Sequence, residues 1–220
     1  MLKYLSIIND GYYKEGLGMK KKIFTTEFIT KVGILAAIEV IFAFVSQFIK
    51  IGPASINLAL IPIAFGAIMF GPVCGALLGF LNGAMVLAAA DTQAYFMNTD
   101  MFGPWCIFGT IVVCLLKCTA AGVASGFIYK LLKNKNDIIA IVVASFVVPV
   151  VNTAIFVIGA CIFFTPALEG LLISVFSFNF LIEIGVTALL TPAIIRTIHV
   201  VQSKSNNENV VALGEDNEEK

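Results

Sequence analysis

Charged residues and the usual catalytic side chains are scarce in this sequence. Only 13% of its 220 residues are charged, the formal net charge is zero, and there is one histidine, His199. A zero net charge gives no electrostatic support for binding nucleic acid. The sequence contains no GxxxxGK[ST] phosphate loop, so we do not expect it to hydrolyse ATP by that route. It also lacks GxSxG and HExxH, and we therefore expect that it is not an enzyme.

Cysteines are few, and their surroundings do not suggest a metal site. Cys114 and Cys118 share a helix face, but no histidine or carboxylate accompanies them at the spacing of metal ligands. We interpret all five cysteines as small packing residues and expect no metal and no cofactor. They lie in or beside apolar stretches, at Cys74, Cys106, Cys114, Cys118 and Cys161.

Long apolar runs dominate the chain. With 59% hydrophobic residues it is too apolar for a soluble domain of this length. A helix that crosses the bilayer core needs about 20 apolar residues. Four runs reach that length, one nearly does, and the second is short; they are residues 29–49, 58–70, 73–90, 105–132, 138–164 and 171–200. This pattern predicts an all-α integral membrane protein with a bundle of six transmembrane helices.

The distribution of positive charge predicts the orientation. With the N-terminus in the cytoplasm, the outer connections contain only Lys50, and Lys117 lies inside the fourth run. The remaining 12 of the 14 Lys and Arg residues then face the cytoplasm. Because such a bias sets orientation during insertion, we expect both termini to be cytoplasmic.

The sequence is organised as one membrane domain with two tails. We expect residues 1–26 to form a cytoplasmic N-terminal segment, 27–202 the six-helix domain, and 203–220 a disordered acidic cytoplasmic tail. Met19 opens the stretch MKKKIFTTEF, a natural start for a membrane protein. Residues 1–18 are therefore either an over-extended gene start or a short amphipathic arm.

Ionisable and amide side chains lie at a common depth within the runs. Four of them are about ten to twelve residues from the outer ends, roughly 15–18 Å deep, which is near the bilayer centre. They are Glu39, Lys117, Asn152 and Glu183. Ionisable residues at this depth are costly and usually functional. Lys117 either belongs to a substrate site or pairs with Glu183 or Glu39 merely to neutralise itself.

The last run adds a polar stripe. Asn179, Glu183 and Thr187 are four residues apart and share one helix face, which resembles the wall of a binding cavity. Asn82 and Asn57 are further candidates for substrate binding, nearer the outside.

Small residues recur every four positions in two runs. The third run contains Gly71, Gly75, Gly79 and Gly83, and the fourth contains Cys118, Gly122 and Gly126. Such strips let helix backbones approach closely in lipid. They predict either packing inside the bundle or a surface for another membrane subunit. In the second case a leucine at Gly79 would spare ligand binding and stop assembly.

Several segments resemble a known family. They are residues 56–87 (INLALIPIAFGAIMFGPVCGALLGFLNGAMVL), LLKCTAAGVASGFIYKLL, PVVNTAIF and NFLIEIGVTALLTPAIIRTI. Together they resemble the substrate-binding (S) subunits of energy-coupling-factor (ECF) vitamin transporters, from Met19 to about Val200. The resemblance implies a six-helix subunit of an ABC importer in a bacterial plasma membrane. Such a subunit binds a vitamin or related micronutrient outside and works with a coupling transmembrane subunit and two cytoplasmic ATPase subunits.

The resemblance also implies roles for individual residues. The ligand would lie among the last three helices, at Lys117, Asn152, Asn179 and Glu183. Residues 50–57 would form a lid and residues 91–104 a second cover, with Tyr95, Phe96 and Trp105 available to stack on a ring. Trp105 equally suits an anchor at the membrane interface.

The coupling interface is the last feature that the resemblance implies. It would use Gly33 and Ala37, which approximate the family's Ala-x-x-x-Ala pattern, and the strip Gly75, Gly79 and Gly83. A function of another class stays open, namely a self-sufficient secondary carrier or a non-transporting membrane scaffold. The absence of an evident internal repeat weighs against the carrier.

Overall fold

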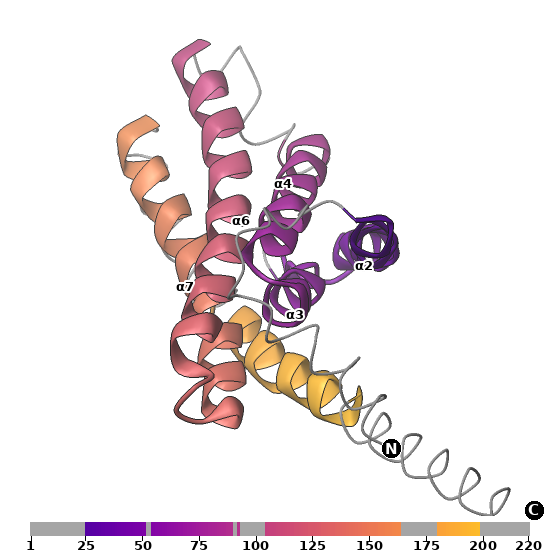
Figure 1. Ribbon diagram of the computed structural model, residues 1–220. Helices are drawn as coiled ribbons and strands as arrows, with labels where there is room; N and C mark the ends of the chain where they lie inside the picture. The colour runs from indigo at the N-terminus through magenta and orange to yellow at the C-terminus, as the bar shows by residue number, and fades with distance from the viewer. Residues whose placement is uncertain (1–24, 52–53, 90–91, 93–103, 164–179, 199–220) are drawn as a thin grey trace, which may run out of the picture. The chain divides into compact units, whose positions relative to one another are not determined.

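The helices of the structure coincide with the apolar runs. The computed structural model, shown in Figure 1, describes residues 25–51, 54–89, 92, 104–163 and 180–198. Four helices are long and apolar enough to cross a membrane: α2 (Thr26–Ser46), α6 (Pro104–Leu132), α7 (Asp137–Phe163) and the helix Phe180–Ile198. Two shorter apolar helices are α3 (Leu60–Phe70) and α4 (Pro72–Ala88). The predicted all-helical architecture with six apolar helices is confirmed, four of them being long enough to cross a membrane, whereas the cytoplasmic location of the termini stays a prediction.

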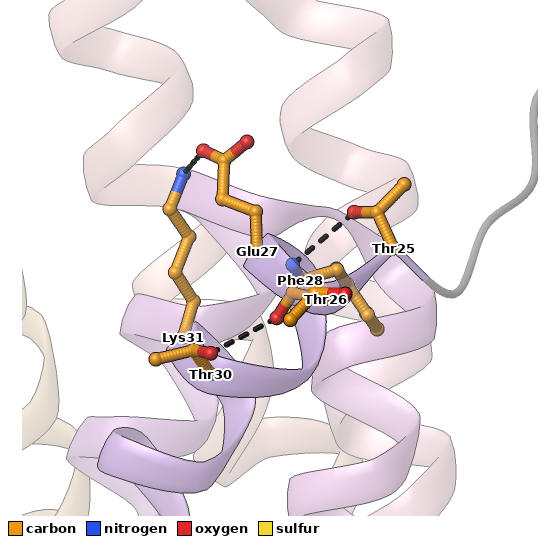
Figure 2. Close-up of polar contacts among 6 residues, drawn as sticks. All are labelled: Thr25, Thr26, Glu27, Phe28, Thr30 and Lys31. Carbon is orange, nitrogen blue, oxygen red and sulfur yellow. Dashed lines mark hydrogen bonds and ion pairs between the residues drawn. The ribbon is translucent and has the colours of Figure 1, made fainter.

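The chain divides into two units, residues 1–31 and 32–220. In the first unit, local contacts define the start of α2 (Figure 2). The hydroxyl oxygen of Thr25 accepts a hydrogen bond from the backbone N–H of Phe28 at 3.2 Å, which caps the helix. The side chains of Glu27 and Lys31 form an ion pair one turn apart. Both are exposed, so the pair contributes little stability.

Within the second unit, a short hairpin joins α2 to α3. Strands β1 (Lys50–Ile51) and β2 (Ala54–Ser55) pair antiparallel, with Lys50 opposite Ser55. Just before the hairpin, the hydroxyl oxygen of Ser46 accepts a hydrogen bond from the backbone N–H of Leu58 at 2.9 Å. This bond ties the end of α2 to the start of α3 on either side of the segment that the resemblance implied to be a lid.

The joint between α3 and α4 is a single glycine. Gly71 has a φ of +96°, the only positive φ in the described part of the chain. Pro72 follows at the first position of α4, where its missing N–H costs nothing and its fixed φ suits a helix. A residue with a side chain would be strained at Gly71, so the tight joint depends on glycine.

Helices α4 and α6 pack together through their two strips of small residues, and run side by side in Figure 1. Residues later in α4 contact residues earlier in α6, so the two helices are antiparallel. A Cβ added at each glycine of α4 would lie within 2.7 Å of a backbone oxygen of α6: Gly75 meets Gly122, Gly79 meets Cys118, and Gly83 meets Cys114. The strip therefore packs inside the bundle, the first of the two interpretations.

Polarity is inverted between the inside and the outside of the bundle. Large apolar side chains are exposed along the long helices, including Phe44 (61%), Leu131 (70%) and Leu189 (73%). Polar and charged side chains are buried instead: Glu39, Asn82, Lys117, Ser125, Ser145, Asn152, Glu183, Thr187 and Thr191. An apolar surface of this extent is unfavourable in water and favourable in lipid. The structure is that of a multi-pass membrane protein.

Candidate functional site

Lys117 lies in the middle of α6 and is buried, with 8% of its surface exposed. Its ammonium nitrogen lies over the ring of Phe156 from α7, 5.0 Å from the ring centroid. This is a cation–π geometry, which stabilises a desolvated ammonium only in part. Lys117 interacts electrostatically with Glu183, yet among the described residues it forms no ion pair with a carboxylate. A direct Lys117–Glu183 or Lys117–Glu39 pair is therefore not what holds this cation.

Glu183 lies on the helix Phe180–Ile198, and its side chain is buried. Its carboxylate oxygen Oε1 accepts a hydrogen bond from the backbone N–H of Asn57 at 3.1 Å. Asn57 was predicted as a substrate ligand, and here its backbone attaches the segment after the hairpin to the last helix. Thr187, which belongs to the predicted polar stripe, is also buried, as is Thr191 four residues further on.

Cys118 connects Asn82 and Asn152, two of the predicted site residues. The side-chain amide of Asn82 donates to the Cys118 sulfur at 3.4 Å, and this thiol donates to the amide oxygen of Asn152 at 3.5 Å. The three buried side chains come from α4, α6 and α7. Because sulfur is a weak hydrogen-bonding partner, these two hydrogen bonds orient the three helices more than they stabilise the fold. Sequence reasoning missed this role, although Cys118 directly follows Lys117.

Glu39 reaches the interior from α2 and is completely buried. Neither of its carboxylate oxygens has a hydrogen-bond partner in the described part of the structure. It interacts electrostatically with the thiols of Cys74 and Cys118. Of the four residues predicted at one depth, Lys117 interacts electrostatically with Glu183, and Asn152 accepts a hydrogen bond from the Cys118 thiol, whereas Glu39 comes from α2.

Four aromatic and amide candidates are placed differently or are not described. Asn179 and Tyr95 lie outside the described residues, as does Phe96. Trp105, at the start of α6, is 62% exposed, and its ring packs against Phe163 at 5.3 Å and Phe108 at 6.1 Å between centroids. An exposed tryptophan at a helix end fits an anchor at the membrane interface better than a buried ligand contact.

The predicted coupling residues separate into two groups. Gly75, Gly79 and Gly83 are buried against α6, so a partner subunit could reach them only by separating α4 from α6. A coupling role for these three glycines stays a prediction. Gly33 and Ala37 lie on the exposed side of α2, and a Cβ added at Gly33 would meet nothing within 4 Å. This face leaves room for another helix.

The arrangement suits non-covalent binding of a small polar molecule. A buried cation on α6 interacts with a buried carboxylate on the last helix, and the aromatic ring beneath the cation and a buried amide both come from α7. Within the described ranges, no group of three or more His, Cys, Asp or Glu side chains could hold a metal ion. Such a site can recognise both a hydrogen-bond acceptor, at Lys117, and a donor, at Glu183.

Comparison with known proteins identifies the family. The family described as "ECF transporter, substrate-specific component" matches residues 27–195, from the first turn of α2 to within three residues of the end of the last helix. A search of curated proteins found no match. The family consists of substrate-binding subunits of transporters and is not catalytic. The chain therefore belongs to the substrate-specific components of ECF transporters.

Proposed function

We propose that this subunit captures a water-soluble vitamin or related micronutrient outside the cell and delivers it inward through a bacterial plasma membrane. The observation that carries the proposal is Lys117, a buried cation at mid-helix that forms no ion pair with a described carboxylate. A desolvated ammonium needs a partner of opposite charge or a strong acceptor. In a family that binds substrates, a ligand is the natural partner.

The geometry suggests how such a ligand would be held. A carboxylate or carbonyl group would approach Lys117 over the Phe156 ring, and Asn152 would offer amide contacts. A donor group of the ligand would compete for Glu183 with the backbone N–H of Asn57. Because Asn57 follows the hairpin, a ligand that binds Glu183 would release the segment proposed as the lid from the last helix.

Transport would depend on partner subunits. The described structure and the sequence offer no phosphate loop, so ATP hydrolysis would come from two cytoplasmic ATPase subunits. A coupling transmembrane subunit would contact the exposed face of α2 at Gly33 and Ala37, where small residues allow close helix packing.

Mass spectrometry of the purified protein tests the proposed function. After expression in rich medium and gentle extraction, a small molecule should co-purify at close to one molecule per chain. It should carry a carboxylate or carbonyl group for Lys117. A protein that consistently contains no small molecule, and that binds none from a panel of vitamins, would contradict the proposal.

Transport by the chain alone would favour the alternative, a self-sufficient carrier. Proteoliposomes that contain only this chain should bind the identified molecule without accumulating it. Addition of the coupling and ATPase subunits with ATP inside the vesicles should start uptake. Sustained uptake without them would replace the proposed mechanism.

Cysteine labelling tests the proposed orientation. In a variant whose five native cysteines are replaced by serine, cysteines at Asp100 and Glu169 should react in intact cells with a reagent that cannot cross the membrane. A cysteine at Lys133 should react only after the cells are opened. The reason is the predominance of positive charge on the inner side. Labelling of position 133 from outside would invert the topology.

A further inference from the structure

Helix α2 is attached to the bundle by one narrow stripe. Its buried residues are Leu35, Glu39 and Ser46, which are four and seven residues apart and share one face. Leu35 lies against Gly66 of α3, since a Cβ added to that glycine would be 3.2 Å from the leucine side chain. Ser46 accepts the hydrogen bond from Leu58. Most of the remaining surface of α2 is exposed, so the attachment depends on these few contacts.

The middle of the stripe is a carboxyl group without a partner. Glu39 is 0% exposed, and neither oxygen makes a hydrogen bond within the described residues. The titratable groups that interact with it are thiols, Cys74 on α4 and Cys118 on α6. Helix α3 contains no titratable residue, and α2 contributes only the distant Glu27 and Lys31. No described cation is available to neutralise it.

A comparison with Glu183 shows what is missing. Glu183 has a backbone N–H donor at 3.1 Å and interacts with Lys117, and both contacts favour its ionised form against the larger cost of its burial. Glu39 has neither, and an ionised carboxylate without donors is strongly disfavoured in a buried site. Two carboxyl groups in contrasting environments are expected to hold different protonation states.

We propose that Glu39 is a proton-binding site whose occupancy controls the attachment of α2. With the proton bound, the neutral side chain packs between Leu35 and Ser46 and α2 stays on the bundle. When the proton leaves, the carboxylate must reach water or lipid headgroups, and α2 detaches along the stripe. The inference does not depend on which substrate the protein carries.

Infrared spectroscopy of the full chain in lipid nanodiscs tests the first half of the proposal. At neutral pH the wild type should show the carbonyl band of a protonated carboxylic acid. The band should be absent from Glu39→Gln and present in Glu27→Gln, a matched change of an exposed carboxylate on the same helix. An unchanged band in Glu39→Gln, or no such band in the wild type, would overturn the assignment.

Stability and hydrogen exchange test the second half. The folded protein holds a proton on Glu39 that the unfolded chain releases at neutral pH, so stability should fall as the pH rises. When the pH rises from about 7 to about 10, the melting temperature of Glu39→Gln should fall by at most about half as much as that of the wild type. Exchange in α2, corrected for the intrinsic effect of pH, should rise in the wild type and in Glu27→Gln, but not in Glu39→Gln.

Two outcomes would overturn this second half. One is equal pH dependence of melting and exchange in the wild type and Glu39→Gln. The other is a gain in wild-type stability with sodium at constant ionic strength that Glu39→Gln lacks, because the carboxylate would then hold a metal cation. The infrared measurement on the wild type at neutral pH needs no variant, so absence of the band would overturn the proposal even if Glu39→Gln folds poorly.

Discussion

Replacement of Lys117 by methionine is expected to weaken ligand binding about 10-fold to about 1000-fold, because loss of one partner of a desolvated charged contact costs roughly 2–4 kcal/mol. Methionine keeps the length and most of the apolar volume of the lysine. It removes the ammonium that lies over the Phe156 ring. The change should therefore act on binding more than on folding. The measurements are the amount of co-purified small molecule and its Kd by calorimetry.

The matched control is Lys130→Met on the same helix, where the lysine is exposed, and its affinity should equal that of the wild type. Lys117→Met combined with Glu183→Gln separates a structural from a functional cation. If the two charges only balance each other, the double variant should regain both stability and affinity. If they form the substrate site, it should fold and still bind weakly. Full affinity in the double variant would refute the assignment.

Gly79→Leu is expected to prevent α4 from packing on α6. A single Cβ at this position would already lie 2.2 Å from the Cys118 backbone oxygen and 2.9 Å from the Cα of Thr119. Backbone atoms in the middle of a helix cannot move aside cheaply, so the helices must separate at a cost of about 3 kcal/mol or more. The yield of monodisperse protein and its melting temperature should fall sharply. Ligand binding should be lost with them, because Cys118 adjoins Lys117.

Gly33→Leu makes the same substitution where the structure leaves space, and it serves as the control for Gly79→Leu. A Cβ at Gly33 meets nothing within 4 Å, so this variant should fold and bind ligand normally. If α2 contacts the coupling subunit there, Gly33→Leu should nevertheless impair assembly and uptake. A stable Gly79→Leu protein with normal affinity would show that the α4–α6 contact is looser than its geometry indicates.

The bounds of two long helices could be predicted closely from the sequence, whereas the first run, 29–49, was three residues off at each end of α2. The apolar runs 105–132 and 138–164 correspond to α6 (Pro104–Leu132) and α7 (Asp137–Phe163) within one residue at each end. A helix in lipid must be apolar along its whole length, so the limits of an apolar run nearly equal the limits of the helix. The hairpin β1–β2 could not be foreseen, because two-residue strands leave no periodic pattern.

The choice of helix neighbours was beyond sequence reasoning. A four-residue repeat of glycines shows which face of α4 is bare, but not which helix covers it. Only the structure shows that Gly75 opposes Gly122 and that the two strips pack against each other. The same limit applies to the site. The location of Lys117 and Glu183 in apolar helices could be predicted, whereas the ring of Phe156 and the thiol of Cys118 depend on how α6 and α7 face each other.

The match between the two strips of small residues leaves their alignment ambiguous. Both repeat every four residues, so a slip of one helix by four residues, ~6 Å, would again oppose small side chains to backbone. Close approach is thus compatible with several alignments of α4 and α6. Only the observed one brings Asn82 to the thiol that Asn152 also uses. In coiled coils a buried amide can select one helix alignment among several that pack almost equally well. Asn82 would select the alignment of α4 and α6 in the same way.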